Sequence, residues 1–205
     1  MRKPAIILLG AGGHAEACID VVEQQGRFVI AGLIGTPQEV GSEKCGYLVI
    51  GTDAELPGVA KECQHALVAA GQIKTPDIRI QLFALAQTLG LELPIIVSPH
   101  SYVSPRATLG AGTIVMHGAI INYGARVGAN CIVNSRALIE HGVSIGDHCH
   151  VSTGAIVNGS ARIGEGSFVG SGSTIKERIS LGRRCVVGMA CCVRHDQADA
   201  SRVFG

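Results

Sequence analysis

Hydrophobic positions recur every six residues over the second half of the chain. The row runs from Val97 to Val193, and all seventeen of its positions are Val, Ile or Leu. The position four residues further along is mostly Ala, Ser, Thr or Cys, and a Gly recurs every 18 residues from Gly110 to Gly182. Six-residue sides grouped in 18-residue coils predict a three-sided parallel β-helix. The aliphatic residues would fill a narrow prism, and the Gly would lie where a Cβ is costly.

The first 96 residues show a different pattern, in which strands and helices alternate. Apolar runs typical of strands cover residues 5–9, 28–34, 47–50, 65–70 and 93–97. Helical patterns cover residues 15–25 and 76–89, and Asp53 is interpreted as the cap of a short helix. Strands separated by helices predict a small parallel sheet. We therefore expect two domains, a small α/β domain over 1–96 and a β-helix over 97–205.

Composition and charge exclude several classes of protein. Aromatic residues make up only 3% of the chain, which suits a prism too narrow for large rings, and the net charge of +1 argues against nucleic-acid binding. No apolar run reaches the roughly 20 residues of a membrane helix, and we expect no membrane association. The eight Cys contain no Cys-x-x-Cys pair and indicate free thiols in a cytoplasmic protein.

The charge is unevenly divided between the predicted domains. Residues 1–96 have 7 Lys and Arg against 10 Asp and Glu, a net charge of −3, and residues 97–205 have 10 against 6, a net charge of +4.

The residues Asp147-His148-Cys149-His150 are of the types that bind zinc. Cys149 falls in the small inward position, however, so we predict no metal site.

Two stretches could bear chemistry. Gly10-Ala11-Gly12-Gly13-His14 ends a strand and opens a helix, where backbone N–H groups suit a phosphate; an ordinary turn is an equally good interpretation. His141 comes two residues after the inward Ile139 and should lie on the outer wall of the prism. An imidazole there could act as a general base near neutral pH, or could simply be a solvated side chain.

The hexapeptide row resembles that of the left-handed β-helix acyltransferases. Together with the Gly-rich opening and the stretch Asn134-Ser135-Arg136-Ala137-Leu138-Ile139-Glu140-His141, it resembles the sugar acetyltransferases typified by PglD and NeuD over nearly the whole chain. The resemblance implies a left-handed helix and an N-terminal domain that holds a nucleotide-sugar. It also implies acetyl-CoA as co-substrate on the β-helix, and a homotrimer with active sites between subunits.

The resemblance also implies roles for individual residues. His141 would be the general base, with Glu140 as the local carboxylate, because Gly142 stands where the family often has an acidic residue. The implied substrate contacts are Gly12, Gly13, His14, Gly35, Thr36 and Gly71. The implied acetyl-CoA contacts are His150, Gly159, Ser171 and Met189. The family typically has acidic residues after the second strand that touch the nucleoside, whereas this chain has Leu33-Ile34-Gly35-Thr36.

We therefore expect an enzyme that transfers acetyl from acetyl-CoA to the amine of a nucleotide-linked 4-amino-4,6-dideoxy sugar for surface glycans. The attack would be direct, without an acyl-enzyme. One alternative is O-acetylation of a sialic-type sugar. Another is a sugar-binding β-helix scaffold without catalytic activity.

Overall fold

The computed structural model describes residues 3–204, which form two compact units. The first, the α/β unit, comprises residues up to 71 together with 77–96. The second, the β-helix unit, comprises residues from 97 onward together with the short segment 72–76. This segment follows the last loop of the α/β sheet in sequence but packs with the prism, which the sequence pattern did not predict.

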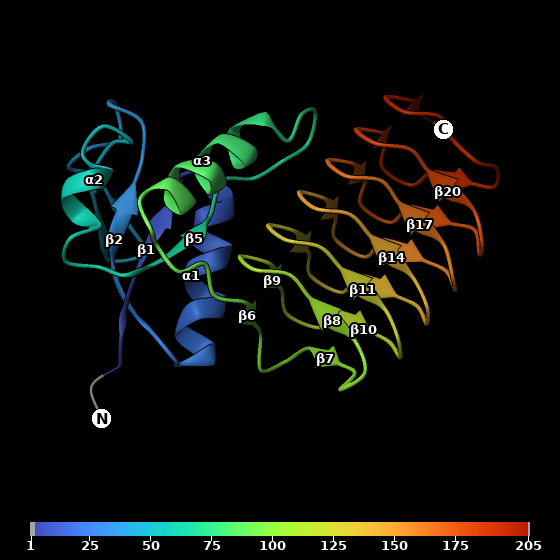
Figure 1. Ribbon diagram of the computed structural model, residues 1–205, viewed down its shortest axis with the longest axis horizontal. Helices are drawn as coiled ribbons and strands as arrows, with labels where there is room; N and C mark the ends of the chain where they lie inside the picture. Colours follow the sequence, from blue (N-terminus) through green and yellow to red (C-terminus); the bar gives the residue numbers. More distant parts are fainter. Residues whose placement is uncertain (1–2, 205) are drawn as a thin grey trace. The chain divides into compact units, whose positions relative to one another are not determined.

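The α/β unit is built on a five-stranded sheet of order β3-β4-β2-β1-β5 (Figure 1). Its strands are β1 Ala5–Leu9, β2 Val29–Ile34, β3 Glu43–Lys44, β4 Tyr47–Gly51 and β5 His65–Val68. β1, β2, β4 and β5 run parallel, as predicted, whereas β3 is antiparallel to β4. The sheet is therefore mixed. The turn between β3 and β4 places Cys45 and Gly46 at φ of 49° and 82°, in the left-handed region that suits a two-residue hairpin.

Among residues 3–96, this unit has three helices: α1 Gly13–Gln25, α2 Leu56–Val59 and α3 Asp77–Thr88. The helix cap expected at Asp53 is wrong, because Glu55 is the N-cap of α2. The strand predicted over residues 93–97 is also wrong, both in its length and in the sheet that it joins. Only β6, Ile96–Val97, forms there, and it pairs with a strand of the β-helix, while Glu92 makes an isolated bridge to His65.

The β-helix unit consists of two-residue strands that form three parallel sheets, or faces (Figure 1). The first face contains β6, β9 Ile114–Val115, β12 Ile132–Val133, β15 His150–Val151, β18 Phe168–Val169, β21 Val186–Val187 and β23 Arg202–Val203. The second face contains β7 Tyr102–Val103, β10 Ile120–Ile121, β13 Leu138–Ile139, β16 Ile156–Val157, β19 Thr174–Ile175 and β22 Cys192–Val193. The third face contains β8 Thr108–Leu109, β11 Arg126–Val127, β14 Ser144–Ile145, β17 Arg162–Ile163 and β20 Ser180–Leu181.

The predicted aliphatic row fills the prism. Every one of its members is the second residue of a strand, and from Val115 to Val193 each is at most 4% exposed. The small positions are inward as well, including the four buried Cys at 131, 149, 185 and 191. A Cβ added to Gly164 would lie 2.4 Å from the backbone of the next coil, which explains the Gly that recurs every 18 residues. The three-sided β-helix is thus confirmed.

The outward residues differ between the faces. The third face is polar, with Arg126, Ser144 and Arg162 in register. The second face instead bears an apolar column of exposed or half-buried side chains, which we call the face-two column: Tyr102, Ile120, Leu138 and Ile156. Among the described residues, no helix is long and apolar enough to cross a membrane.

Candidate functional site

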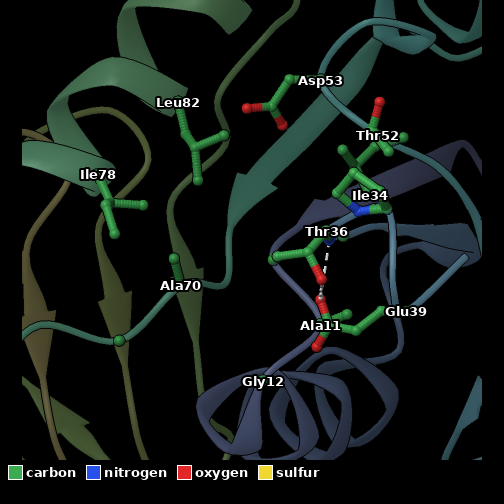
Figure 2. Close-up of a pocket in the computed structure, with 14 residues that line it drawn as sticks. Ala11, Gly12, Ile34, Thr36, Glu39, Thr52, Asp53, Ala70, Ile78 and Leu82 are labelled. Carbon is green, nitrogen blue, oxygen red and sulfur yellow. Dashed lines mark hydrogen bonds between the residues drawn. The ribbon is translucent and has the colours of Figure 1, made fainter.

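A cavity of about 600 Å³ opens in the α/β unit where the parallel strands end (Figure 2). Because parallel strands direct their carboxyl ends to one edge, the loops after β1, β2, β4 and β5 meet there, at the position where open α/β sheets bind ligands. Four of the six expected substrate residues line the cavity: Gly12, Gly35, Thr36 and Gly71. These four residues thus surround one cavity.

The other two expected substrate residues lie beside the cavity. Gly13 begins α1, whose N-terminus has no side-chain cap, so backbone N–H groups of its first turn are available to a ligand. His14 packs behind Gly71, since a Cβ on that glycine would lie 3.4 Å from the His14 Cβ. Gly35 is required by close packing, because its Cβ would lie 2.9 Å from Val49 and 3.2 Å from Ala11.

The cavity contains carboxylates that the sequence reasoning missed. Glu39 Oε2 accepts hydrogen bonds from the Thr36 backbone N–H at 2.8 Å and from its hydroxyl at 2.9 Å. The hydrogen bond from the Thr36 backbone N–H is the largest cause of the lowered pKa of the Glu39 carboxyl. Asp53, in the loop after β4, also lines the cavity. The cavity therefore has acidic residues, although they come from further along the chain than the end of the second strand.

His141 lies at the corner of the prism that follows β13, and its side chain is 71% exposed. Its Nδ1–H donates to Glu140 Oε2 at 3.4 Å, and its backbone N–H donates to the same oxygen at 3.2 Å. Asn122, one coil earlier, fixes this carboxylate through a 3.1 Å hydrogen bond. Because Nδ1 faces the carboxylate, Nε2 is the ring nitrogen left to accept a proton.

The same corner repeats in the next two coils. A Cβ on Gly159 would lie 2.7 Å from His141 Cε1 and 2.8 Å from Nε2, so the ring lies directly over this glycine. A second cavity, of about 480 Å³, adjoins the ring, and its lining includes Glu177 and Arg178 as well as Glu140, His141 and Gly159. Glu177 and Arg178 were not singled out in the sequence, although Glu177 follows Gly159 by one 18-residue coil.

The expected acetyl-CoA contacts fall into separate places. His150 is only 6% exposed: its Nδ1–H donates to the Gln72 carbonyl at 2.6 Å, and Asn134 Nδ2 donates to its Nε2 at 3.0 Å. Ser171 and Met189 are exposed, one coil apart, at the corner between the first and second faces. Gly159 lies at the other edge of the second face, beneath His141. The structure therefore does not bring these four residues together within one chain.

Comparison with known proteins agrees with these features. The PglD N-terminal domain family matches residues 5–83. The hexapeptide repeat of succinyl-transferase family matches residues 120–158 and 160–193. No curated protein sequence matches this chain.

Several solved structures are similar over nearly the whole chain. PerB from Caulobacter crescentus, in complex with CoA and GDP-perosamine, is 27% identical with a TM-score of 0.91, covering 98% of this chain and 94% of that one. The acetyltransferase domain of PglB from Neisseria gonorrhoeae, with acetyl coenzyme A, is 28% identical with a TM-score of 0.91, covering 100% and 97%. WeeI from Acinetobacter baumannii, at 21% identity, a TM-score of 0.84 and coverage of 98% and 97%, has the same fold. Residues 5–83 thus belong to the PglD N-terminal domain family, and residues 120–158 and 160–193 are hexapeptide repeats of the succinyl-transferase type.

Proposed function

We propose that this protein transfers acetyl from acetyl-CoA to the amine of a nucleotide-linked 4-amino-4,6-dideoxy sugar. The observation that supports this most directly is the pairing of Glu140 with His141, which leaves Nε2 as the proton-accepting nitrogen. A base so placed can take a proton from an attacking amine. The neighbour that holds a sugar nucleotide is a perosamine N-acetyltransferase, which favours an amine over a hydroxyl acceptor and an enzyme over an idle scaffold.

The reaction is a direct displacement at the thioester. The amine nitrogen forms a bond to the acetyl carbonyl carbon as His141 Nε2 takes a proton from that nitrogen. The tetrahedral intermediate then collapses, the C–S bond breaks, and the CoA thiolate leaves and is protonated. Glu140 acts through His141: its carboxylate holds the ring orientation and stabilises the imidazolium that forms. No acyl-enzyme is needed.

The cavity of the α/β unit is the proposed site for the nucleotide-sugar. Its volume of about 600 Å³ is in the range of small-molecule sites. The uncapped first turn of α1 at Gly12 and Gly13 supplies backbone N–H donors and the positive end of a helix dipole for a diphosphate. Gly35, Thr36 and Gly71 lie around the same space, with His14 supporting Gly71 from behind.

A homotrimer would complete the acetyl-CoA site. His141 and Gly159 lie at one edge of the second face, whereas Ser171 and Met189 lie at its other edge. The exposed face-two column lies between them and gives a second copy an apolar surface. A neighbouring subunit would then bring its own Ser171 and Met189 edge toward His141.

The eight free thiols fit an enzyme of the cytoplasm, where thiols stay reduced.

An acceptor panel tests the proposal. CoA release is measured with acetyl-CoA and nucleotide-linked 4-amino sugars, with hydroxyl sugars including sialic acid, and with no acceptor. Turnover confined to the 4-amino sugars is expected, together with a loss of about 100-fold or more in kcat for His141→Ala. Turnover confined to sialic acid, or full activity of the variant, would refute the proposal. Sedimentation of the protein checks the trimer.

A further inference from the structure

The cavity of the α/β unit contains one carboxylate that the protein itself does not use. Glu39 is held by both the N–H and the hydroxyl of Thr36. Asp53 is exposed, and within residues 3–204 its carboxylate accepts no hydrogen bond and forms no ion pair. Figure 2 shows Asp53 at the upper rim of the cavity, beside Thr52 and apart from Glu39. A carboxylate that lines a cavity and lacks a protein partner is available to a ligand.

The sheet order gives the position of Asp53 relative to the phosphate site. Asp53 follows β4, Thr36 follows β2 and Gly12 follows β1, and these strands are neighbours in the order β4-β2-β1. Two strand spacings, about 10 Å, therefore separate the loop of Asp53 from the first turn of α1. A ribose attached to a diphosphate at Gly12 would occupy most of that gap, which places the base at Asp53.

The opposite side of the cavity has a different character. β5 lies on the other side of β1, and Gly71 follows it. Ile78 and Leu82 of α3 line the cavity there, and in Figure 2 Ile78 lies well away from Asp53, with Leu82 between the two. This apolar wall suits the methyl group of a 6-deoxy sugar. A nucleotide-sugar would therefore lie across the strand ends with its sugar toward β5 and its base toward β4.

We propose that Asp53 recognises the nucleobase and selects guanine. This inference rests on the proposed function and deepens it. A carboxylate offers two acceptor oxygens and no donor. Guanine presents two adjacent donors, N1–H and the N2 amino group, which match the two oxygens in a paired, charge-assisted contact. Uracil presents one N–H between two carbonyl oxygens, and a carboxylate repels both.

Binding of free nucleotides tests the inference without requiring catalysis. Isothermal titration of the intact protein with GDP, 2′-deoxy-GDP, IDP and UDP separates base from ribose recognition, since IDP lacks the N2 amino group. We expect GDP to bind at least 10-fold more tightly than UDP, IDP to be intermediate and 2′-deoxy-GDP to match GDP. Asp53→Asn should weaken GDP by about 10- to 100-fold and should not weaken UDP. Glu43→Gln, an exposed carboxylate on β3 outside the cavity, is the matched control.

Two results would overturn the inference. One is a wild-type protein that binds UDP as tightly as GDP; the other is an equal loss of GDP and UDP on Asp53→Asn, which would place the carboxylate on the ribose. Asp53→Ser, checked by circular dichroism, guards against a folding defect in the first variant. Transfer to a uridine-linked amino sugar that is insensitive to Asp53 would refute the guanine assignment and keep the proposed function. Guanine selectivity without any acetyl transfer would refute the proposed function and keep the guanine assignment.

Discussion

Replacement of Gly159 by Ala should displace the His141 ring while the fold is kept. The added Cβ would lie 2.7 Å from Cε1, 2.8 Å from Nε2 and 3.4 Å from Nδ1. The backbone at Gly159 is the floor of the corner, and the imidazole above it is the exposed end of a side chain with room to move. The ring, rather than the coil, is therefore expected to shift.

The size of the effect follows from the contact distances. Carbon atoms in ordinary contact lie about 3.5–4.0 Å apart, so a ring held at 2.7 Å must move by about 1 Å. A displacement of about 1 Å at a reacting group can cost about 100-fold in rate. This corresponds to about 2.7 kcal/mol in the activation free energy. The hydrogen bond from His141 Nδ1 to Glu140, already 3.4 Å long, would be lost in the shifted position.

Steady-state kinetics separate this role from a contact with acetyl-CoA. We expect kcat of Gly159→Ala to fall about 100-fold with KM for acetyl-CoA unchanged. On a His141→Ala background the same change should cost nothing further, because the displaced group is already absent. Gly58→Ala, where a Cβ meets nothing within 4 Å, is the control for the substitution itself. A raised KM with kcat intact would instead make Gly159 an acetyl-CoA contact.

Three further predictions follow from other contacts. Glu140→Gln removes the charge beside the imidazole and should lower kcat about 10-fold without a change in KM for acetyl-CoA; unchanged kcat would refute its role. Ellman's reagent should modify only Cys45 and Cys192 in the folded protein, since the other six thiols are buried and desolvation raises the pKa of Cys18 to about 12; more than two fast-reacting thiols would contradict this. Gly164→Ala places a Cβ against the backbone of the next coil and should destabilise the protein by about 1–3 kcal/mol, and an unchanged Tm would contradict the packing.

The β-helix was predictable because its packing repeats. Each coil presents the same inward position, so one local rule, tested seventeen times between Val97 and Val193, specifies the whole prism. The same repetition accounts for Gly164 and its equivalents, whose backbones touch the next coil. The hairpin turn at Cys45 and Gly46 offered no comparable signal, because a single short strand has no repeat and its partner is set by the turn alone.

The sites were predictable only in part, because they depend on contacts between distant segments. Alternation along a strand would make Glu140 and His141 point apart, but each strand has only two residues and both side chains lie at a corner, where alternation does not apply. The local sequence around Asp53 suggests only a helix cap. Its loop lies beside the Gly12 turn because of the order of the sheet, which the sequence does not show. Nothing in residues 72–76 indicated packing on the prism.

The two visits of the chain to the β-helix unit limit how this protein can be recombined. A chimera joined at residue 97 would exchange the prism but leave residues 72–76 with the wrong parent. The His150 Nδ1–H would then lose the Gln72 carbonyl unless the new parent supplied an equivalent one, and an unsatisfied buried donor costs about 1–3 kcal/mol. Exchange of acceptor specificity between relatives should therefore graft the loops after β1, β2, β4 and β5 and keep the segment 72–76 with its own prism. A functional chimera of this fold therefore takes the prism and the segment 72–76 from the same parent.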